Sequence, residues 1–184
     1  MPKRKKTTNS QKYKFTFPDI ITFSRLIFVA LFTYTLFKGY STLLVLTIFA
    51  LGALTDLFDG EVARGFHEVS DVGARMDQIF DRVFTGVAFF ALFFYFKDNN
   101  LTFMILPLIL SVTREIVGIP GFMVAFLRGK DSYHVKEIGK VTTFAQGIVF
   151  GAIIIQASWA LYLAVPLAIL GIFAGIDYLR YALS

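Results

Sequence analysis

The sequence predicts an all-α integral membrane protein: a bundle of six transmembrane helices with an N-terminal interfacial segment. Of its 184 residues, 56% are hydrophobic, and the mean hydropathy is +0.66. Both values are high for a soluble domain. Apolar runs of roughly the twenty residues that cross a bilayer recur along the chain, with charged residues gathered between them. Because the connections are short, we expect a single membrane domain.

The elements follow from where the apolar runs begin and end. Residues 1–14 are basic and polar without apolar periodicity, so we expect a disordered tail ahead of the membrane domain at 15–184. Residues 15–19, Phe-Thr-Phe-Pro-Asp, indicate an interfacial segment, with Pro18 early in or just before the first helix. The predicted spans are 20–37, 42–66, 72–96, 101–127, 136–156 and 159–181.

The basic residues predict the orientation of the bundle. Lys and Arg precede the first span and flank the second and fourth connections, whereas the opposite connections hold only Lys38 and Lys97. Because basic residues are retained on the cytoplasmic side, we expect a multi-pass protein of the cell membrane whose termini and active site are cytoplasmic. The net charge of +5 fits attraction to anionic membrane lipids, and no soluble module is available to bind nucleic acid.

Four carboxylates lie in the apolar part of the chain, where charged side chains are costly and are functional by default. Asp56 and Asp59 are three residues apart, and Asp77 and Asp81 are four apart, so each pair shares one face of its helix. Two facing pairs could enclose divalent cations. Hard oxygen donors without His or Cys favour Mg²⁺ or Mn²⁺, and we expect two ions.

Small residues accompany both acidic pairs. Gly60 and Ala63 continue the helical stripe of the first pair, and Gly73 continues that of the second. They would let a nucleotide approach the backbone closely, with its diphosphate near the carboxylates, although small residues in membrane spans also serve helix packing. Arg64, at the cytoplasmic end of the same helix, is placed to contact phosphate.

Together these positions form the pattern D-x-x-D-G-x-x-A-R, eight residues, then G-x-x-x-D-x-x-x-D. The pattern resembles that of the CDP-alcohol phosphotransferase family. The resemblance implies transfer of a substituted phosphate from a CDP-linked alcohol to an acceptor hydroxyl with release of CMP, on a six-helix bundle that is commonly a homodimer. It also implies that Asp56, Asp59, Asp77 and Asp81 bind metal, that Asp81 is in addition the general base, and that Gly60, Ala63, Arg64 and Gly73 line the CDP site.

Three further segments, at 17–25, 111–116 and 139–146, resemble the branch of this family that uses glycerol 3-phosphate. The resemblance implies a CDP-diacylglycerol donor, or a CDP-linked ether lipid. We assign Arg114 and Lys140 to the acceptor phosphate, with Arg25 as a weaker third candidate. Asp19, Thr113 and Val141 depart from the branch pattern, so phosphatidylglycerol and inositol phosphate stay open as acceptors.

Other interpretations of single residues and of the whole chain remain. Arg114 could pair with Glu115 or extend to the interface, Lys140 could be an ordinary helix-end lysine, and His67 and His134 are expected to be solvated. A membrane prenyltransferase would also bind a diphosphate through metal, but it needs a larger bundle with distant acidic motifs. An ion carrier could use the Asp cluster but would leave the small residues and Arg64 without a role.

Overall fold

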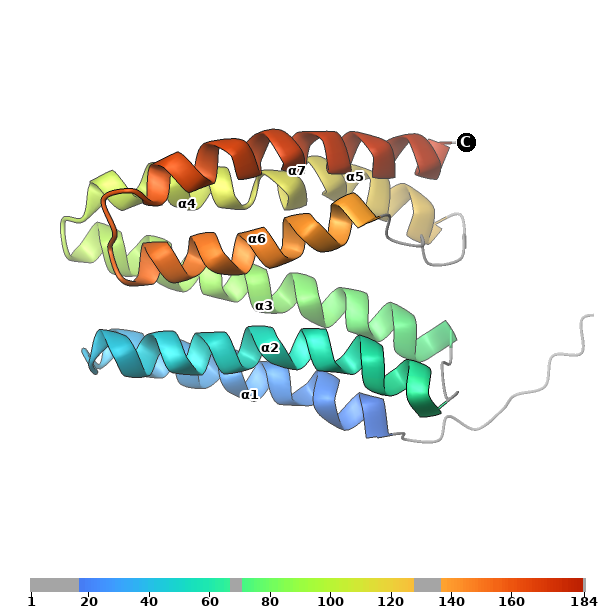
Figure 1. Ribbon diagram of the computed structural model, residues 1–184, viewed down its shortest axis with the longest axis horizontal. Coiled ribbons are helices and arrows are strands. Elements are labelled where there is room, and N and C mark those ends of the chain that lie inside the picture. The colour runs from blue at the N-terminus through green and yellow to red at the C-terminus, as the bar shows by residue number, and fades with distance from the viewer. Residues whose placement is uncertain (1–16, 67–70, 128–136, 184) are drawn as a thin grey trace, which may run out of the picture.

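The protein is an all-helical bundle whose helices lie side by side along its longest axis in the computed structural model (Figure 1). The structure describes residues 17–66, 71–127 and 137–183. Their elements are α1 (Phe17–Phe37), α2 (Thr42–Phe66), α3 (Asp71–Asp98), the 3-10 helix η1 (Thr102–Met104), α4 (Ile105–Ser111), α5 (Thr113–Leu127), α6 (Glu137–Ile154) and α7 (Ala160–Leu183).

The helices match the predicted segments with two differences. Helix α1 begins at Phe17, so residues 17–19 form its first turn and Pro18 lies early in the helix, while the interfacial location of residues 15–19 stays a prediction. The predicted helix at 101–127 is interrupted at Val112, which separates α4 from α5. At the break, the hydroxyls of Ser111 and Thr113 donate to the carbonyls of Leu108 and Leu110, each three residues earlier, and such back-bonding often bends a helix.

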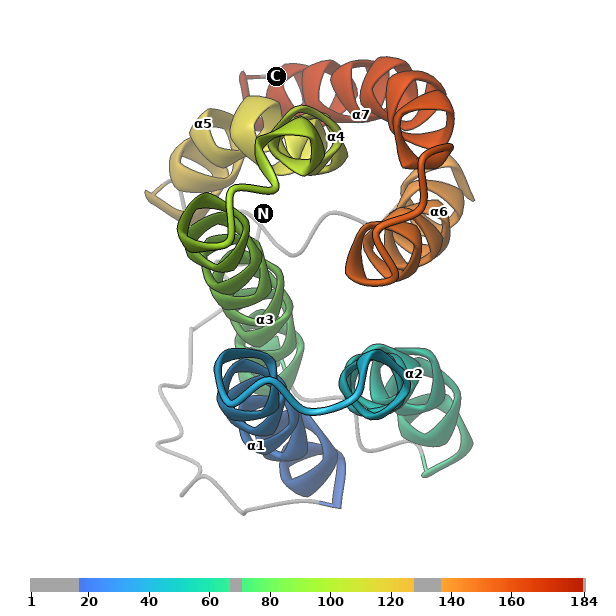
Figure 2. The same cartoon turned by 90° about the vertical axis from the view of Figure 1, so that its left-hand side faces the viewer.

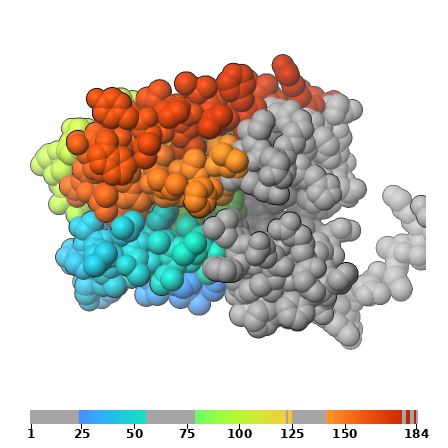
Figure 3. Space-filling model, viewed as in Figure 1, coloured from blue at the N-terminus to red at the C-terminus, as the bar shows by residue number. Residues whose placement is uncertain are grey.

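Membrane insertion is supported by two segments of the described chain, Ile79–Asp98 and Thr102–Gly121, which are long and apolar enough to cross a bilayer. Four other helices contain shorter apolar segments, and the six-span count stays a prediction. Helices α2, α6 and α7, which Figure 3 shows on one face of the molecule, each expose large apolar side chains, among them Leu43, Ile148 and Ile169. Apolar surface on this scale is typical of contact with lipid.

The start of α1 and the end of α7 lie at the same end of the bundle (Figure 1). At the opposite end, α1, α3 and α6 finish with left-handed residues, namely Gly39, Asn100 and Gln156. Each of these three helices ends with the paired hydrogen bonds of a Schellman motif. In α1, for example, the N–H of Tyr40 donates to the carbonyl of Thr35. These hydrogen bonds satisfy backbone carbonyls that would find no donor in the hydrocarbon core of a bilayer.

An aromatic cluster centred on Phe49 of α2 joins four helices. Its ring lies 5.5 Å from that of Phe32 of α1, 5.7 Å from that of Phe84 of α3 and 5.6 Å from that of Phe150 of α6. Figure 2 shows α1 and α2 on one side of α3, with α6 and α7 across from them. The cluster therefore fixes α2, α3 and α6 around the space that holds the candidate site.

Candidate active site

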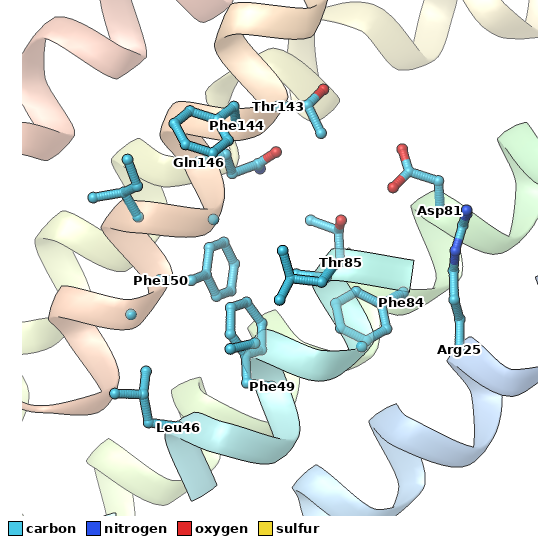
Figure 4. Close-up of a pocket in the computed structure, with 17 residues that line it drawn as sticks. Arg25, Leu46, Phe49, Asp81, Phe84, Thr85, Thr143, Phe144, Gln146 and Phe150 are labelled. Carbon is cyan, nitrogen blue, oxygen red and sulfur yellow. The ribbon is translucent and has the colours of Figure 1, made fainter. Parts of the chain in front are cut away.

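A cavity of about 260 Å³ lies between α2, α3 and α6 (Figure 4). Three rings of the aromatic cluster, those of Phe49, Phe84 and Phe150, form part of its wall. Small residues of α2 and α6 open the space between the rings, namely Ala50, Gly52, Ala53, Gly147 and Gly151. The apolar walls of this cavity suit an apolar ligand chain.

Polar side chains line one region of the same cavity. Arg25 of α1 and Asp81 of α3 both line it, and Figure 4 shows the Arg25 side chain extending to the level of Asp81. Thr85 of α3, together with Thr143 and Gln146 of α6, completes the polar lining. Arg25 is only 1% exposed, so its charge is held inside the bundle. One cavity thus offers apolar walls beside a charged, hydrogen-bonding end, which suits an amphipathic ligand.

The motif residues lie on the two helices that lead to this polar end. Asp56, Asp59, Gly60, Ala63 and Arg64 belong to the last part of α2. Gly73, Asp77 and Asp81 belong to the first part of α3. Of these eight, only the Asp81 side chain is among those described, and it is half-buried. The predicted metal site therefore stays a prediction, with one of its four carboxylates placed at the cavity.

The acceptor candidates lie on neighbouring helices. Arg114 is half-buried in the first turn of α5, and its Nη1 donates to Oγ1 of Thr143 on α6. Glu115 accepts a hydrogen bond at Oε2 from Nε2 of Gln146, over 2.9 Å. Between the described side chains of Arg114 and Glu115 there is no ion pair, so the alternative in which Arg114 simply pairs with Glu115 is not supported. Each is bound to α6 instead.

Several predicted features lie outside the described residues. Lys140 is within α6, but its side chain is not described, so its acceptor role is untested. The tail at 1–14 and both histidines, His67 and His134, also lie outside the described part of the chain.

Sequence reasoning assigned no role to three residues that shape the site. Gln146 and Thr143 bridge to α5, and Gly52 lets α2 pack closely, since a Cβ there would lie 2.8 Å from Phe84 Cε2 and 2.9 Å from Phe28 Cβ. Polar residues within apolar helices were the available signal for the first two. Their partners lie 29 to 35 residues away in sequence, which no local pattern reveals.

Comparison with known proteins agrees with this geometry. The family model for CDP-alcohol phosphatidyltransferase matches residues 15–170, which include α2, α3 and the α6 residues Thr143 and Gln146. The chain is 30% identical over 175 residues to a probable phosphatidylglycerophosphate synthase of Mycobacterium tuberculosis, covering 90% of this chain and 80% of that protein. It is 27% identical over 178 residues to a CDP-diacylglycerol–glycerol-3-phosphate 3-phosphatidyltransferase of Salmonella paratyphi A, covering 92% and 96%.

A protein of the same name from Shigella flexneri serotype 5b is 28% identical over 178 residues, with 92% of this chain and 96% of that protein covered. The family match spans most of the chain and includes the acidic motif, which favours phosphatidyl transfer over prenyl transfer or ion transport. Apolar helices and a polar-ended cavity are what an enzyme acting on a lipid requires. The chain belongs to the CDP-alcohol phosphatidyltransferase family and is a phosphatidyltransferase.

Proposed function

We propose that this enzyme transfers the phosphatidyl group of CDP-diacylglycerol to the hydroxyl of glycerol 3-phosphate and releases CMP. The observation that carries the proposal is the cavity, which joins apolar walls to a polar end containing Asp81. The relatives named for this reaction cover nearly the whole chain. The donor's acyl chains lie along the aromatic walls, and its diphosphate lies at the polar end.

Asp81 is the general base of the reaction. Its carboxylate accepts the proton of the acceptor hydroxyl, whose oxygen attacks the phosphorus atom that carries the diacylglycerol. A new P–O bond forms to the acceptor, and the bond to the CMP phosphate oxygen breaks, leaving its electron pair on CMP.

Divalent cations complete the site. Membership in the family carries an expectation of divalent-metal dependence, and we propose two ions, Mg²⁺ or Mn²⁺, held by Asp56, Asp59, Asp77 and Asp81. An all-oxygen donor set fits either ion. When bound, such ions neutralise the charge of a diphosphate and stabilise the leaving oxygen. Gly60, Ala63, Arg64 and Gly73 hold the CDP group in the same proposal.

Acceptor recognition depends on a second group of cations. Arg114 reaches α6 from the start of α5 and, with Lys140, binds the phosphate of glycerol 3-phosphate. Arg25, placed beside Asp81, contributes a positive charge at the reacting end. We further propose that the protein is a homodimer in the cell membrane, with the motif end of the bundle and both termini in the cytoplasm.

The test is product identification. Purified protein is incubated with CDP-diacylglycerol, Mg²⁺ and, separately, glycerol 3-phosphate, phosphatidylglycerol or inositol phosphate, and the lipid product is identified by mass spectrometry. We expect phosphatidylglycerophosphate and stoichiometric CMP from the first mixture. Phosphatidyl transfer to one of the other acceptors alone would contradict the proposed acceptor while leaving the reaction class intact. A parallel assay with a CDP-linked ether lipid tests the donor.

A further inference from the structure

A buried amide connects α6 to two groups near the start of α5. Nε2 of Gln146 lies 2.9 Å from the Ser111 carbonyl oxygen and 2.9 Å from Oε2 of Glu115. The Gln146 side chain is 6% exposed and also lines the cavity that contains Asp81. Because an amide nitrogen carries two hydrogens, both donors of Gln146 are used by this bridge.

The backbone partner of Gln146 lies where the helix is interrupted. Val112 has φ −105° and ψ 13°, which ends α4 and interrupts the helical hydrogen-bond ladder before α5 begins at Thr113. The carbonyl of Ser111 accepts the Gln146 amide at this break. The amide therefore binds the chain at the break between α4 and α5.

The same turn of α5 has two further contacts. The Arg114 guanidinium donates to Thr143, which precedes Gln146 by three residues and so shares its face of α6. Gly171 of α7 packs so closely against α5 that an added Cβ would lie 3.0 Å from the backbone nitrogen of Arg114. Close packing against α7 and the hydrogen bonds of Arg114 and Glu115 to α6 together restrict the rotation of α5 about its axis.

We propose that Gln146 is a positioning residue for acceptor recognition: by binding Glu115 and the Ser111 carbonyl, it orients Arg114 toward the acceptor phosphate. This inference rests on the proposed function. Adjacent opposite charges in a low-dielectric setting attract strongly. Holding the Glu115 carboxylate on Gln146 keeps it from neutralising Arg114, whose guanidinium is bound to Thr143, a residue of the cavity wall.

The test compares kinetic constants for the two substrates. Gln146→Leu keeps most of the side-chain volume but removes both hydrogen bonds. We expect KM for glycerol 3-phosphate to rise about tenfold or more, because small misplacements of a binding group are costly, while KM for CDP-diacylglycerol changes less than about twofold. In an Arg114→Ala background the same substitution should have little further effect on the acceptor KM, since coupled residues are not additive.

A second readout does not depend on the acceptor. The chain has no cysteine, so Ile116→Cys on α5 and Val141→Cys on α6, both exposed, can carry paired spin labels in the full-length protein. Gln146→Leu should broaden the distribution of distances between the labels. Thr35→Val is the control: it also removes a buried side-chain donor, in this case a hydroxyl that donates to carbonyls of its own helix α1. It should change neither the distances nor the acceptor KM.

Equal increases in both KM values, an unchanged distance distribution, or a full Gln146→Leu effect in the Arg114→Ala background would each overturn the proposal. The last result would mean that Gln146 contacts the acceptor itself. If the unsubstituted protein does not use glycerol 3-phosphate, the proposed acceptor fails, whereas the label distances still decide whether Gln146 fixes α5.

Discussion

At the scale of single residues, the position of Asp81 gives the sharpest expectation for chemistry. It is the one motif carboxylate whose side chain is described, and it lines the cavity with Arg25 and Thr85. Asp81→Asn keeps the shape but cannot accept a proton, so CMP release should fall by about 10²- to 10⁴-fold. Asp98→Asn, an exposed aspartate at the far end of the same helix, is the control and should retain full activity.

Metal dependence belongs to the same scale. Asp56→Asn, Asp59→Asn and Asp77→Asn should each nearly abolish CMP release measured with Mg²⁺ present, and excess chelator should do the same to the unsubstituted enzyme. Circular dichroism of each variant should still report a helical protein. Activity that persists undiminished in chelator would contradict a role for metal in the reaction.

Substitution of Arg114 is expected to affect acceptor binding without affecting donor binding. A hydrogen bond to a charged group contributes about 1.5 to 3 kcal/mol, so Arg114→Ala should lower kcat/KM for glycerol 3-phosphate by roughly ten- to a hundredfold. The comparison uses a second acceptor without phosphate, for which the loss should be small. Arg180→Ala, an exposed arginine near the end of α7, is the matched control. Equal losses for the two acceptors would remove Arg114 from the phosphate site.

At the scale of helices, Gly52 sets how closely α2 approaches α1 and α3. Phe84, which contacts Gly52, lies one turn beyond Asp81 on α3, and Asp56 lies one turn beyond Gly52 on α2. Gly52→Ala should therefore destabilise the protein by about 1 to 3 kcal/mol through overpacking and should lower activity as the motif helices shift. Thermal unfolding and CMP release measure the two effects.

Gly86 provides the control for Gly52. It also lies within a helix, but a Cβ added there would meet no atom within 4 Å. Gly86→Ala should leave activity unchanged and raise stability slightly, because alanine favours helix more than glycine does. If both substitutions have the same effect, close packing at Gly52 does not position the acidic motif.

Sequence and structure agree best where a pattern is local. Apolar runs predicted the helices to within a few residues, and the fixed spacing of the acidic motif identified the reaction. The break at Val112 was missed because it depends on how Ser111 and Thr113 direct their hydroxyls, which apolar content does not report. The role of Gln146 was missed because it depends on partners 31 and 35 residues earlier in the chain.

At the scale of the whole molecule, one end of the bundle resembles a membrane interface. Tyr34, Tyr40, Trp159 and Tyr162 lie in or beside the turns at the end where α1, α3 and α6 finish, and all four are exposed. Lys38 lies 5.9 Å above the ring of Tyr34. Amphipathic aromatic residues gather at the boundary between lipid and water. The 21 residues of α1 span roughly 31 Å at 1.5 Å per residue, close to the thickness of the hydrocarbon core.

This arrangement predicts which side of the membrane each end reaches. Since native cysteine is absent, Ser41→Cys and Asn99→Cys introduce single thiols at the aromatic end, and Arg180→Cys introduces one at the motif end. In intact cells, a membrane-impermeant maleimide should label the first two, whereas Arg180→Cys should react only after the membrane is permeabilised, because basic residues mark the cytoplasmic side. CMP release by each variant confirms that the labelled protein is folded. Labelling of Arg180→Cys in intact cells would place the motif end outside, where neither cytoplasmic glycerol 3-phosphate nor the cytoplasmic pool of divalent cations could reach the site.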